Sequence, residues 1–136
     1  MQIVNEASNR PLSPKHMLIL ETLRAAGRPM TAYELIDALR LAKPCAPPTI
    51  YRGLNRLITD GLAHRLETLN AFIACNHAHP FGNVPMFEIC DVCGSAAEFI
   101  DGEIEQYIFR HTSDHGFMAS RTAIEIRGTC DQCRDQ

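Results

Sequence analysis

Two identically spaced cysteine pairs constrain this chain more than any other feature of its sequence. The letters "CDVC" occupy residues 90–93 and "CDQC" residues 130–133, and the 36 residues between them contain no cysteine. Cysteine pairs of this kind can form disulfides in a secreted domain, a redox-active dithiol, or a metal site assembled from two separate knuckles. The rest of the sequence distinguishes among these three possibilities.

The N-terminus and the hydropathy pattern argue against secretion and therefore against disulfides. The opening letters "MQIVNEASNRPLSPKH" lack the charged and apolar regions of a signal peptide, and no apolar run approaches the roughly 18 residues of a membrane helix. We predict a cytoplasmic location, where thiols stay reduced. A redox dithiol needs only one pair, whereas two knuckles can surround a metal tetrahedrally. We therefore predict a structural zinc bound by Cys90, Cys93, Cys130 and Cys133.

Charge is distributed unevenly along the 136 residues. Residues 1–65 contain nine Lys and Arg against five Asp and Glu, while residues 66–136 contain four against eleven, for a net charge of −3 overall. This asymmetry indicates two modules, and the basic one is a candidate for a polyanionic partner. On charge alone, an ordinary solvated surface explains the basic half equally well.

The basic half carries the signals of three helices followed by a hairpin. Ser13 and Gly27 are suited to cap the two ends of a first helix, and Thr31 with Glu34 has the spacing of a capping box for a second. Two prolines suit the entrance of a third helix in "APPTIYRGLNRLITDGL", and "LAHRLETLNAFIAC" alternates about a turn as two short strands would. Three helices and a hairpin predict a winged helix-turn-helix domain in residues 1–75.

The third helix has a polar face whose side chains suit DNA. Arginine can form paired hydrogen bonds with guanine, asparagine can read adenine, and hydroxyl groups can reach phosphates. A solvated face on a helix that only packs is the competing interpretation. The candidate DNA-binding residues are Thr49, Tyr51, Arg52, Asn55 and Arg56.

The acidic half predicts a small α/β domain in residues 84–136, after a hinge loop at 76–83. The letters "MFEICDVCGSAAEFI" suit two short strands joined by the first knuckle, and "MASRTAIEIRGTCDQC" suits a strand that leads to the second. Between them, "DGEIEQYIFRHTSDHGF" has the spacing of an amphipathic helix with Ile104, Tyr107 and Ile108 facing inward. The fold class that follows is α+β.

Further residues of metal-ligand type gather around the boundary between the two halves. Cys75, His77 and His79 lie in one segment, His64 lies on the preceding strand, and Glu98 follows the first knuckle. Mixed sulfur, imidazole and carboxylate donors suit a zinc site that is weaker and more exchangeable than four thiolates. An equally simple interpretation makes the two histidines loop residues and Cys75 a buried strand cysteine.

The order of these motifs resembles the ferric uptake regulator family. The resemblance spans residues 13–133 and rests on "TIYRGLNRL", the cysteine-rich junction, "FEICDVCG" and "RGTCDQC"; within the family the chain looks like the zinc uptake regulator branch. The resemblance implies a homodimeric, metal-dependent transcriptional repressor and not an enzyme. Loaded with zinc, such a protein binds double-stranded operator DNA of zinc-uptake genes.

Carried over by position, the resemblance implies two zinc sites per protomer. The structural site falls on the two cysteine pairs, and the regulatory site falls on His64, Cys75, Glu98 and one of His77 and His79. This sequence departs from the pattern at one point, because asparagine stands eight residues after Cys75 where the branch has its loop histidine. The His-His-x-His run of the iron-sensing branch is absent before the first knuckle, and a soft cysteine ligand favours zinc over iron.

Other functions stay open at the level of sequence. The same architecture senses iron, manganese or peroxide, and a zinc-stabilised interaction module would share the cysteine pairs. A zinc-dependent enzyme would need an open coordination position, and the sequence has no HExxH or H-x-E…PCxxC signature. His111 and His115 are spaced one helical turn apart and are candidates for a third metal site. Cys45 is interpreted as an incidental thiol and His16 as a surface residue.

Overall fold

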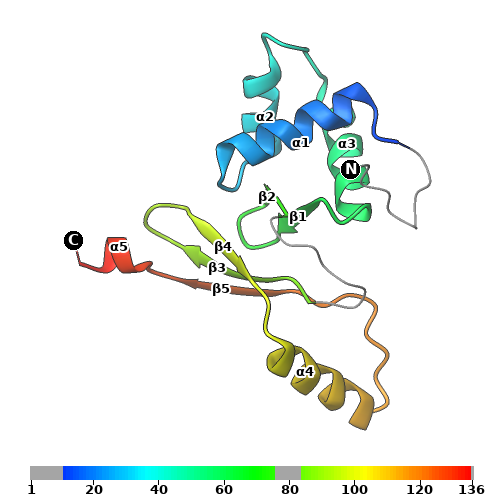
Figure 1. Cartoon of the computed structure of the whole chain (residues 1–136), viewed down its shortest axis with the longest axis vertical. Coiled ribbons are helices and arrows are strands. Elements are labelled where there is room, and N and C mark those ends of the chain that lie inside the picture. Colours follow the sequence, from blue (N-terminus) through cyan, green and yellow to red (C-terminus); the bar gives the residue numbers. More distant parts are fainter. Residues whose placement is uncertain (1–10, 76–83, 136) are drawn as a thin grey trace. The chain divides into compact units, whose positions relative to one another are not determined.

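The computed structural model describes residues 11–75 and 84–135, and the chain divides into two compact units, residues 1–76 and 77–136 (Figure 1). The predicted hinge loop at 76–83, with His77 and His79, lies outside the described residues. Each unit is therefore considered separately. Among the residues that are described, no helix has both the length and the apolar character needed to cross a membrane.

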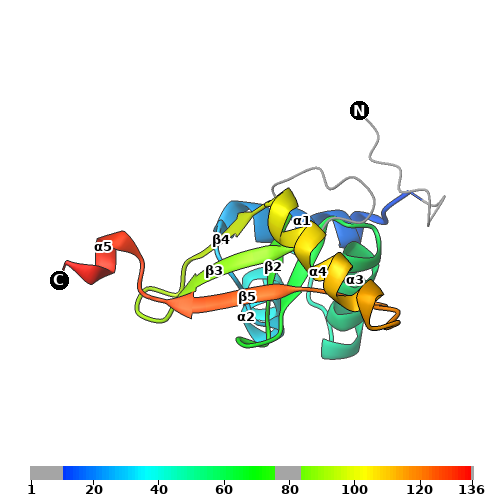
Figure 2. The same cartoon turned by 90° about the horizontal axis from the view of Figure 1, so that it is seen from below.

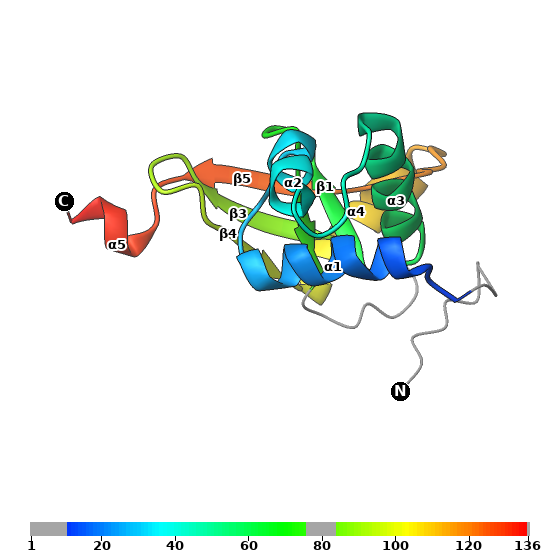
Figure 3. The ribbon, with the colours of Figure 1, turned by 90° about the horizontal axis from the view of Figure 1, so that it is seen from above.

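Unit 1 begins with three helices whose ends follow the capping signals of the sequence. Their bounds are Pro14–Ala26 for α1, Ala32–Leu39 for α2 and Pro47–Thr59 for α3 (Figure 3). The Ser13 side chain accepts a hydrogen bond from the backbone of α1, and Gly27 ends that helix with a φ of 61°, a conformation that glycine adopts without strain. Thr31 and Glu34 form the predicted capping box of α2.

A two-stranded hairpin completes unit 1. Strand β1 (Ala63–Leu66) pairs antiparallel with β2 (Ala71–Ala74), and the backbones of Met30 and Phe72 exchange hydrogen bonds of 2.8 and 2.7 Å that join the hairpin to the segment before α2. Leucine and isoleucine side chains of all three helices pack with Phe72 and Ala74 into one buried apolar cluster. Three helices and a wing on one core confirm the winged helix-turn-helix prediction.

Unit 2 is built on a three-stranded sheet in the order β4-β3-β5 (Figure 2). Strands β3 (Met86–Cys90) and β4 (Ala96–Phe99) are antiparallel, and helix α4 (Gly102–Asp114) crosses over to β5 (Ile124–Gly128), which is parallel to β3; the short helix α5 (Asp131–Arg134) follows. Parallel strands end at the same edge of a sheet. Since Cys90 pairs with Gly128 in the register, both cysteine knuckles start at one edge of this sheet.

The prediction that Ile104, Tyr107 and Ile108 face inward from α4 is wrong within the single chain. Ile104 and Tyr107 are exposed, Tyr107 to 69%, and Ile108 is half-buried, whereas the buried residue of the helix is Glu105. Helical spacing shows that a helix has an apolar side, but it does not show what covers that side. Within one copy of unit 2, these side chains are left largely uncovered.

Candidate metal centre and nucleic-acid interface

The four cysteines of the two knuckles meet at one edge of the unit 2 sheet. Cys90 ends β3, Cys93 lies in the turn after it, and Cys130 and Cys133 lie at the start and within the turn of α5. Their four sulfur atoms lie within 4.8 Å of one another, and the Cys93 and Cys130 Sγ atoms are 3.9 Å apart. Four sulfurs gathered from two distant segments form a donor set that fits a tetrahedral zinc ion.

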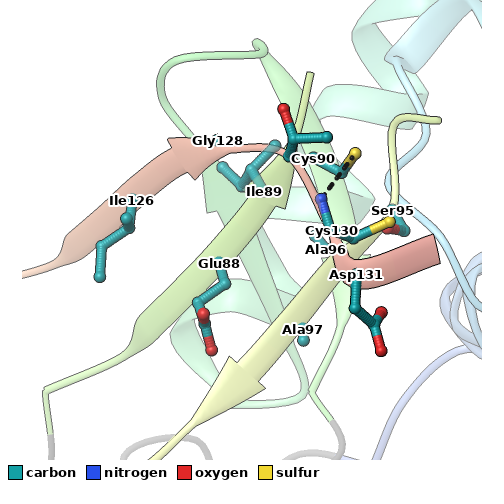
Figure 4. Close-up of a pocket in the computed structure, with 11 residues that line it drawn as sticks. Glu88, Ile89, Cys90, Ser95, Ala96, Ala97, Ile126, Gly128, Cys130 and Asp131 are labelled. Carbon is teal, nitrogen blue, oxygen red and sulfur yellow. Dashed lines mark hydrogen bonds between the residues drawn. The ribbon is translucent and has the colours of Figure 1, made fainter. Parts of the chain in front are cut away.

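Backbone hydrogen bonds and mutual repulsion shape the ionisation of this cysteine cluster. The backbone N–H of Cys130 donates to the Cys90 Sγ at 3.4 Å (Figure 4), and this contact with the neighbouring N–H groups lowers the pKa of Cys90 to about 6. The pKa of Cys133 rises to about 12, chiefly because of its contact with Cys130 and secondly because of burial. Thiolates this close together ionise as a set only beside a cation.

An ion pair next to the cluster connects the first knuckle to β5. The Nε and Nη2 atoms of Arg127 lie 2.8 and 2.7 Å from the Asp91 Oδ1 atom, and the Asp91 backbone N–H donates to the Gly128 carbonyl at 2.8 Å. These contacts fix the turn that carries Cys93 relative to the strand that leads to Cys130. Contacts within the protein itself thus orient the two knuckles toward each other.

Unit 1 brings together two of the other predicted metal ligands. His64 lies on β1 and Cys75 directly follows β2, where its backbone N–H donates to the Leu62 carbonyl at 2.9 Å. The hairpin register places them side by side, and their ligand atoms lie within 4.8 Å of each other. An imidazole and a thiol at this distance suit a borderline-soft cation such as zinc.

The remaining members of that predicted set belong to unit 2 or lie outside the described residues. Glu98 is half-buried on β4, where its backbone is opposite that of Phe87. His77 and His79 fall in the segment 76–83.

Helix α3 presents part of its predicted DNA-binding set to solvent. Tyr51, Arg52 and Asn55 are exposed, and Thr49 is half-buried. The Tyr51 ring packs edge-on against Phe72 of the wing, with ring centroids 6.5 Å apart. This contact helps to fix the position of the Tyr51 hydroxyl. Arg56 differs from the others, since its side chain is only 18% exposed and pairs with an acid on the same helix.

The wing carries an exposed arginine that the sequence analysis did not single out. Arg65 neighbours His64 on β1, and successive side chains of a strand point to opposite faces. Its guanidinium donates to the Asn70 Oδ1 atom at 2.8 Å and lies 3.8 Å from Glu67, so the turn holds the arginine at the tip of the hairpin. Strand alternation could have identified it.

Three minor candidates have simpler roles in the structure. The His111 and His115 rings are 4.5 Å apart and His115 Nδ1 lies 2.8 Å from the His111 carbonyl, but no third ligand-type side chain joins them among the described residues. Cys45 packs partly buried against the unit 1 core, and its Sγ lies 3.3 Å from the Lys43 carbonyl. His16, expected on the surface, is half-buried because it packs against α3.

Comparison of the sequence with known proteins points to one family. The chain is 33% identical over 127 residues to the zinc uptake regulation protein of Escherichia coli K12, a match that covers 92% of this chain and 74% of that protein. The chain belongs to the family of zinc uptake regulation proteins. No protein-family model matches the sequence.

Solved structures of zinc uptake regulators share its fold. Holo XcZur matches with a TM-score of 0.88 at 34% identity, over 99% of this chain and 94% of that one. A zinc uptake regulator complexed with zinc and DNA matches with a TM-score of 0.89 at 30% identity, over 95% and 87%. These matches confirm the resemblance and the fold class inferred from the sequence. The family is one of regulatory proteins and not of enzymes.

Proposed function

We propose that this chain is a zinc-responsive DNA-binding repressor that binds the operators of zinc-uptake genes when it is loaded with zinc. The observation that carries the proposal is the combination of a four-thiolate cluster in unit 2 with a winged helix-turn-helix in unit 1. A related zinc uptake regulator of the same fold has been solved with zinc and DNA. Operator DNA as the partner is in keeping with a cytoplasmic location.

The DNA interface that we propose is the exposed face of α3 together with the wing. Arg52 and Asn55 would read base edges in the major groove, while Thr49 and the Tyr51 hydroxyl would contact phosphates. Arg65 on the wing adds a cation for the DNA backbone. Tyr51, Arg52 and Asn55 are exposed on a helix whose other side packs in the core of unit 1, which suits the reading of bases.

Replacing Arg52 with alanine is expected to remove sequence discrimination. A paired arginine–guanine contact is worth about 1–3 kcal/mol, so the ratio of operator to scrambled-duplex affinity should fall by roughly 5- to 150-fold. Fluorescence anisotropy with both duplexes at one salt concentration measures this ratio. Arg24→Ala, which removes an exposed arginine of α1, is the matched control and should leave the ratio unchanged. An unaltered ratio in Arg52→Ala would exclude Arg52 from base reading.

For zinc, we propose one structural and one regulatory ion per protomer. Cys90, Cys93, Cys130 and Cys133 would hold the structural ion; four thiolates fill a tetrahedral shell and leave no position for a catalytic water. The role that this implies is stabilisation of unit 2 and not catalysis.

The regulatory ion would be bound by His64, Cys75, Glu98 and one of His77 and His79. The proximity of His64 and Cys75 in unit 1 supports the first half of this set, and the family resemblance supports the rest. Because the proposed ligands come from both units, binding of the regulatory ion would favour the conformation in which α3 fits the DNA.

We also propose that the chain is a homodimer through unit 2. Ile100, Ile104, Tyr107 and Phe109 are exposed apolar side chains on or next to α4. On the sheet, a hollow of about 430 Å³ is lined partly by Ala97 and Ile126, with the Glu88 carboxylate beside them (Figure 4). Within the described residues, neither β4 nor β5 pairs with a further strand on its outer side and the apolar side of α4 is largely exposed, so a second copy would add burial.

A dimer should therefore persist at micromolar concentration in sedimentation velocity. The Tyr107→Glu variant places a charge on the exposed side of α4 and should shift the protein toward the monomer. Glu103→Gln, on the same helix but in its polar first turn, is the control. A wild-type protein that sediments as a monomer would contradict the proposal.

A further inference from the structure

Where α1 and α3 pack together, two buried polar atoms have no hydrogen-bond partner within the described residues. They are Oδ1 of Asp60, whose side chain is only 6% exposed, and Nδ1 of His16 on α1. A buried polar atom without a partner is costly, so both groups need another source of stabilisation. Both belong to unit 1 and lie on the side of α3 that packs against α1.

Arg56 supplies that stabilisation for Asp60. Its Nε atom donates to the Asp60 Oδ2 atom at 2.8 Å, one helical turn away on the same helix. Asp60 is the C-cap of α3, where the helix dipole disfavours a negative charge, so the carboxylate depends on a nearby cation. The guanidinium of Arg56 is thus already engaged and largely covered, unlike that of the exposed Arg52.

His16 brings α1 into the same group through a close approach at Gly53. A Cβ atom at Gly53 would lie 3.2 Å from the His16 ring and 2.6 Å from the end of the Ile19 side chain, so α1 packs directly on the α3 backbone there. Burial lowers the pKa of His16, the nearby Arg56 charge lowers it further, and Asp60 partly offsets both; Lys15 is the remaining charge that acts on it. These effects favour the neutral form of the imidazole.

From this arrangement we propose that Arg56 is a positioning residue, which acts with Asp60 and His16 to fix the recognition helix α3 against α1 and does not itself contact DNA. The inference rests on the proposed function, since it assigns roles within the same DNA interface. It separates the candidate arginines of α3 into one that reads bases, Arg52, and one that orients the helix, Arg56.

The salt dependence of DNA binding distinguishes positioning from contact. The probe is a duplex selected by the zinc-loaded wild-type protein from a random-sequence library. For a positioning role, Arg56→Gln should weaken binding about tenfold with an unchanged slope of log affinity against log salt, whereas loss of a phosphate contact makes that slope shallower by about 0.9. A shallower slope in Arg56→Gln overturns the inference.

Asp60→Asn provides the complementary arm, because it leaves the guanidinium in place. If Arg56 were a DNA contact, freeing it from Asp60 would leave binding unchanged or make it tighter. For a positioning role, Asp60→Asn should weaken binding about as much as Arg56→Gln does, and the double variant should recover most of the loss, since two neutral side chains restore a matched pair. All measurements are made where circular dichroism shows the variants folded. If Arg56→Gln does not fold, Asp60→Asn alone decides.

A titration without DNA separates failure of this inference from failure of the proposed function. Followed by the NMR signals of its ring, His16 should titrate at a lower pH in Asp60→Asn and at a higher pH in Arg56→Gln than in the wild type. Unchanged titration in both variants would show that the three side chains do not act together. A wild-type protein that titrates as expected but selects no duplex in zinc would overturn the proposed function while retaining the cluster.

Discussion

Replacing Cys93 with serine is expected to leave unit 2 unfolded or aggregated at any zinc concentration. Among the described residues, the apolar core of unit 1 draws on all three helices and the hairpin, whereas unit 2 buries few apolar side chains beyond those of β3. Binding of structural zinc in zinc-finger peptides contributes about 10–16 kcal/mol, far more than a sheet of this size can supply from burial. Loss of one thiolate should therefore remove most of the stability of unit 2.

Far-UV circular dichroism, sedimentation and zinc content per chain measure this outcome together. Cys45→Ser is the matched control, because it makes the same chemical change at a cysteine that packs on the unit 1 core, away from the cluster. The control should keep its zinc and its cooperative unfolding transition. A folded Cys93→Ser dimer with wild-type DNA binding would show that the four-cysteine site is dispensable for the fold.

Replacing Cys75 with alanine is expected to abolish the response of DNA binding to zinc while the fold is retained. Changes in partners of metal ligands already cost about 10–100-fold in metal affinity, so loss of a direct ligand should cost at least about 100-fold. Cys75 directly follows β2 and is only half-buried, so its side chain contributes little to the core. Zinc affinity and operator affinity should fall together, because the proposed role of this ion is to favour the DNA-binding conformation.

A zinc titration read by operator gel shift, with circular dichroism as the folding check, tests this expectation. Cys45→Ala serves as the cysteine control, and His64→Ala should reproduce the effect of Cys75→Ala if the two side chains share one ion. His77→Ala and His79→Ala, compared side by side, identify the fourth ligand as the one whose loss shifts the titration. A normal zinc response in Cys75→Ala would place the sensor elsewhere, with His111 and His115 as the next candidates.

Features that depend on local chemistry were readable from the sequence. The helix boundaries at Ser13, Gly27 and Thr31 were predicted correctly because capping requires particular side chains at particular positions, whatever the rest of the chain does. The cysteine cluster was predictable for a similar reason. Each knuckle lies next to a strand and supplies two cysteines of metal-ligand spacing. Four thiolates form one tetrahedral site only if the two knuckles come together.

Features that depend on which surfaces face each other were decided only by the tertiary structure. The sequence placed Arg56 among the DNA-binding residues, because periodicity shows that it leaves the apolar stripe but not that its side chain is largely covered and paired with Asp60. His16 was expected on the surface for the same reason, and Ile104 and Tyr107 of α4, which are exposed, were expected to face inward. Helical spacing fixes the direction in which a side chain leaves its own helix, whereas burial depends on neighbours that only the folded chain supplies.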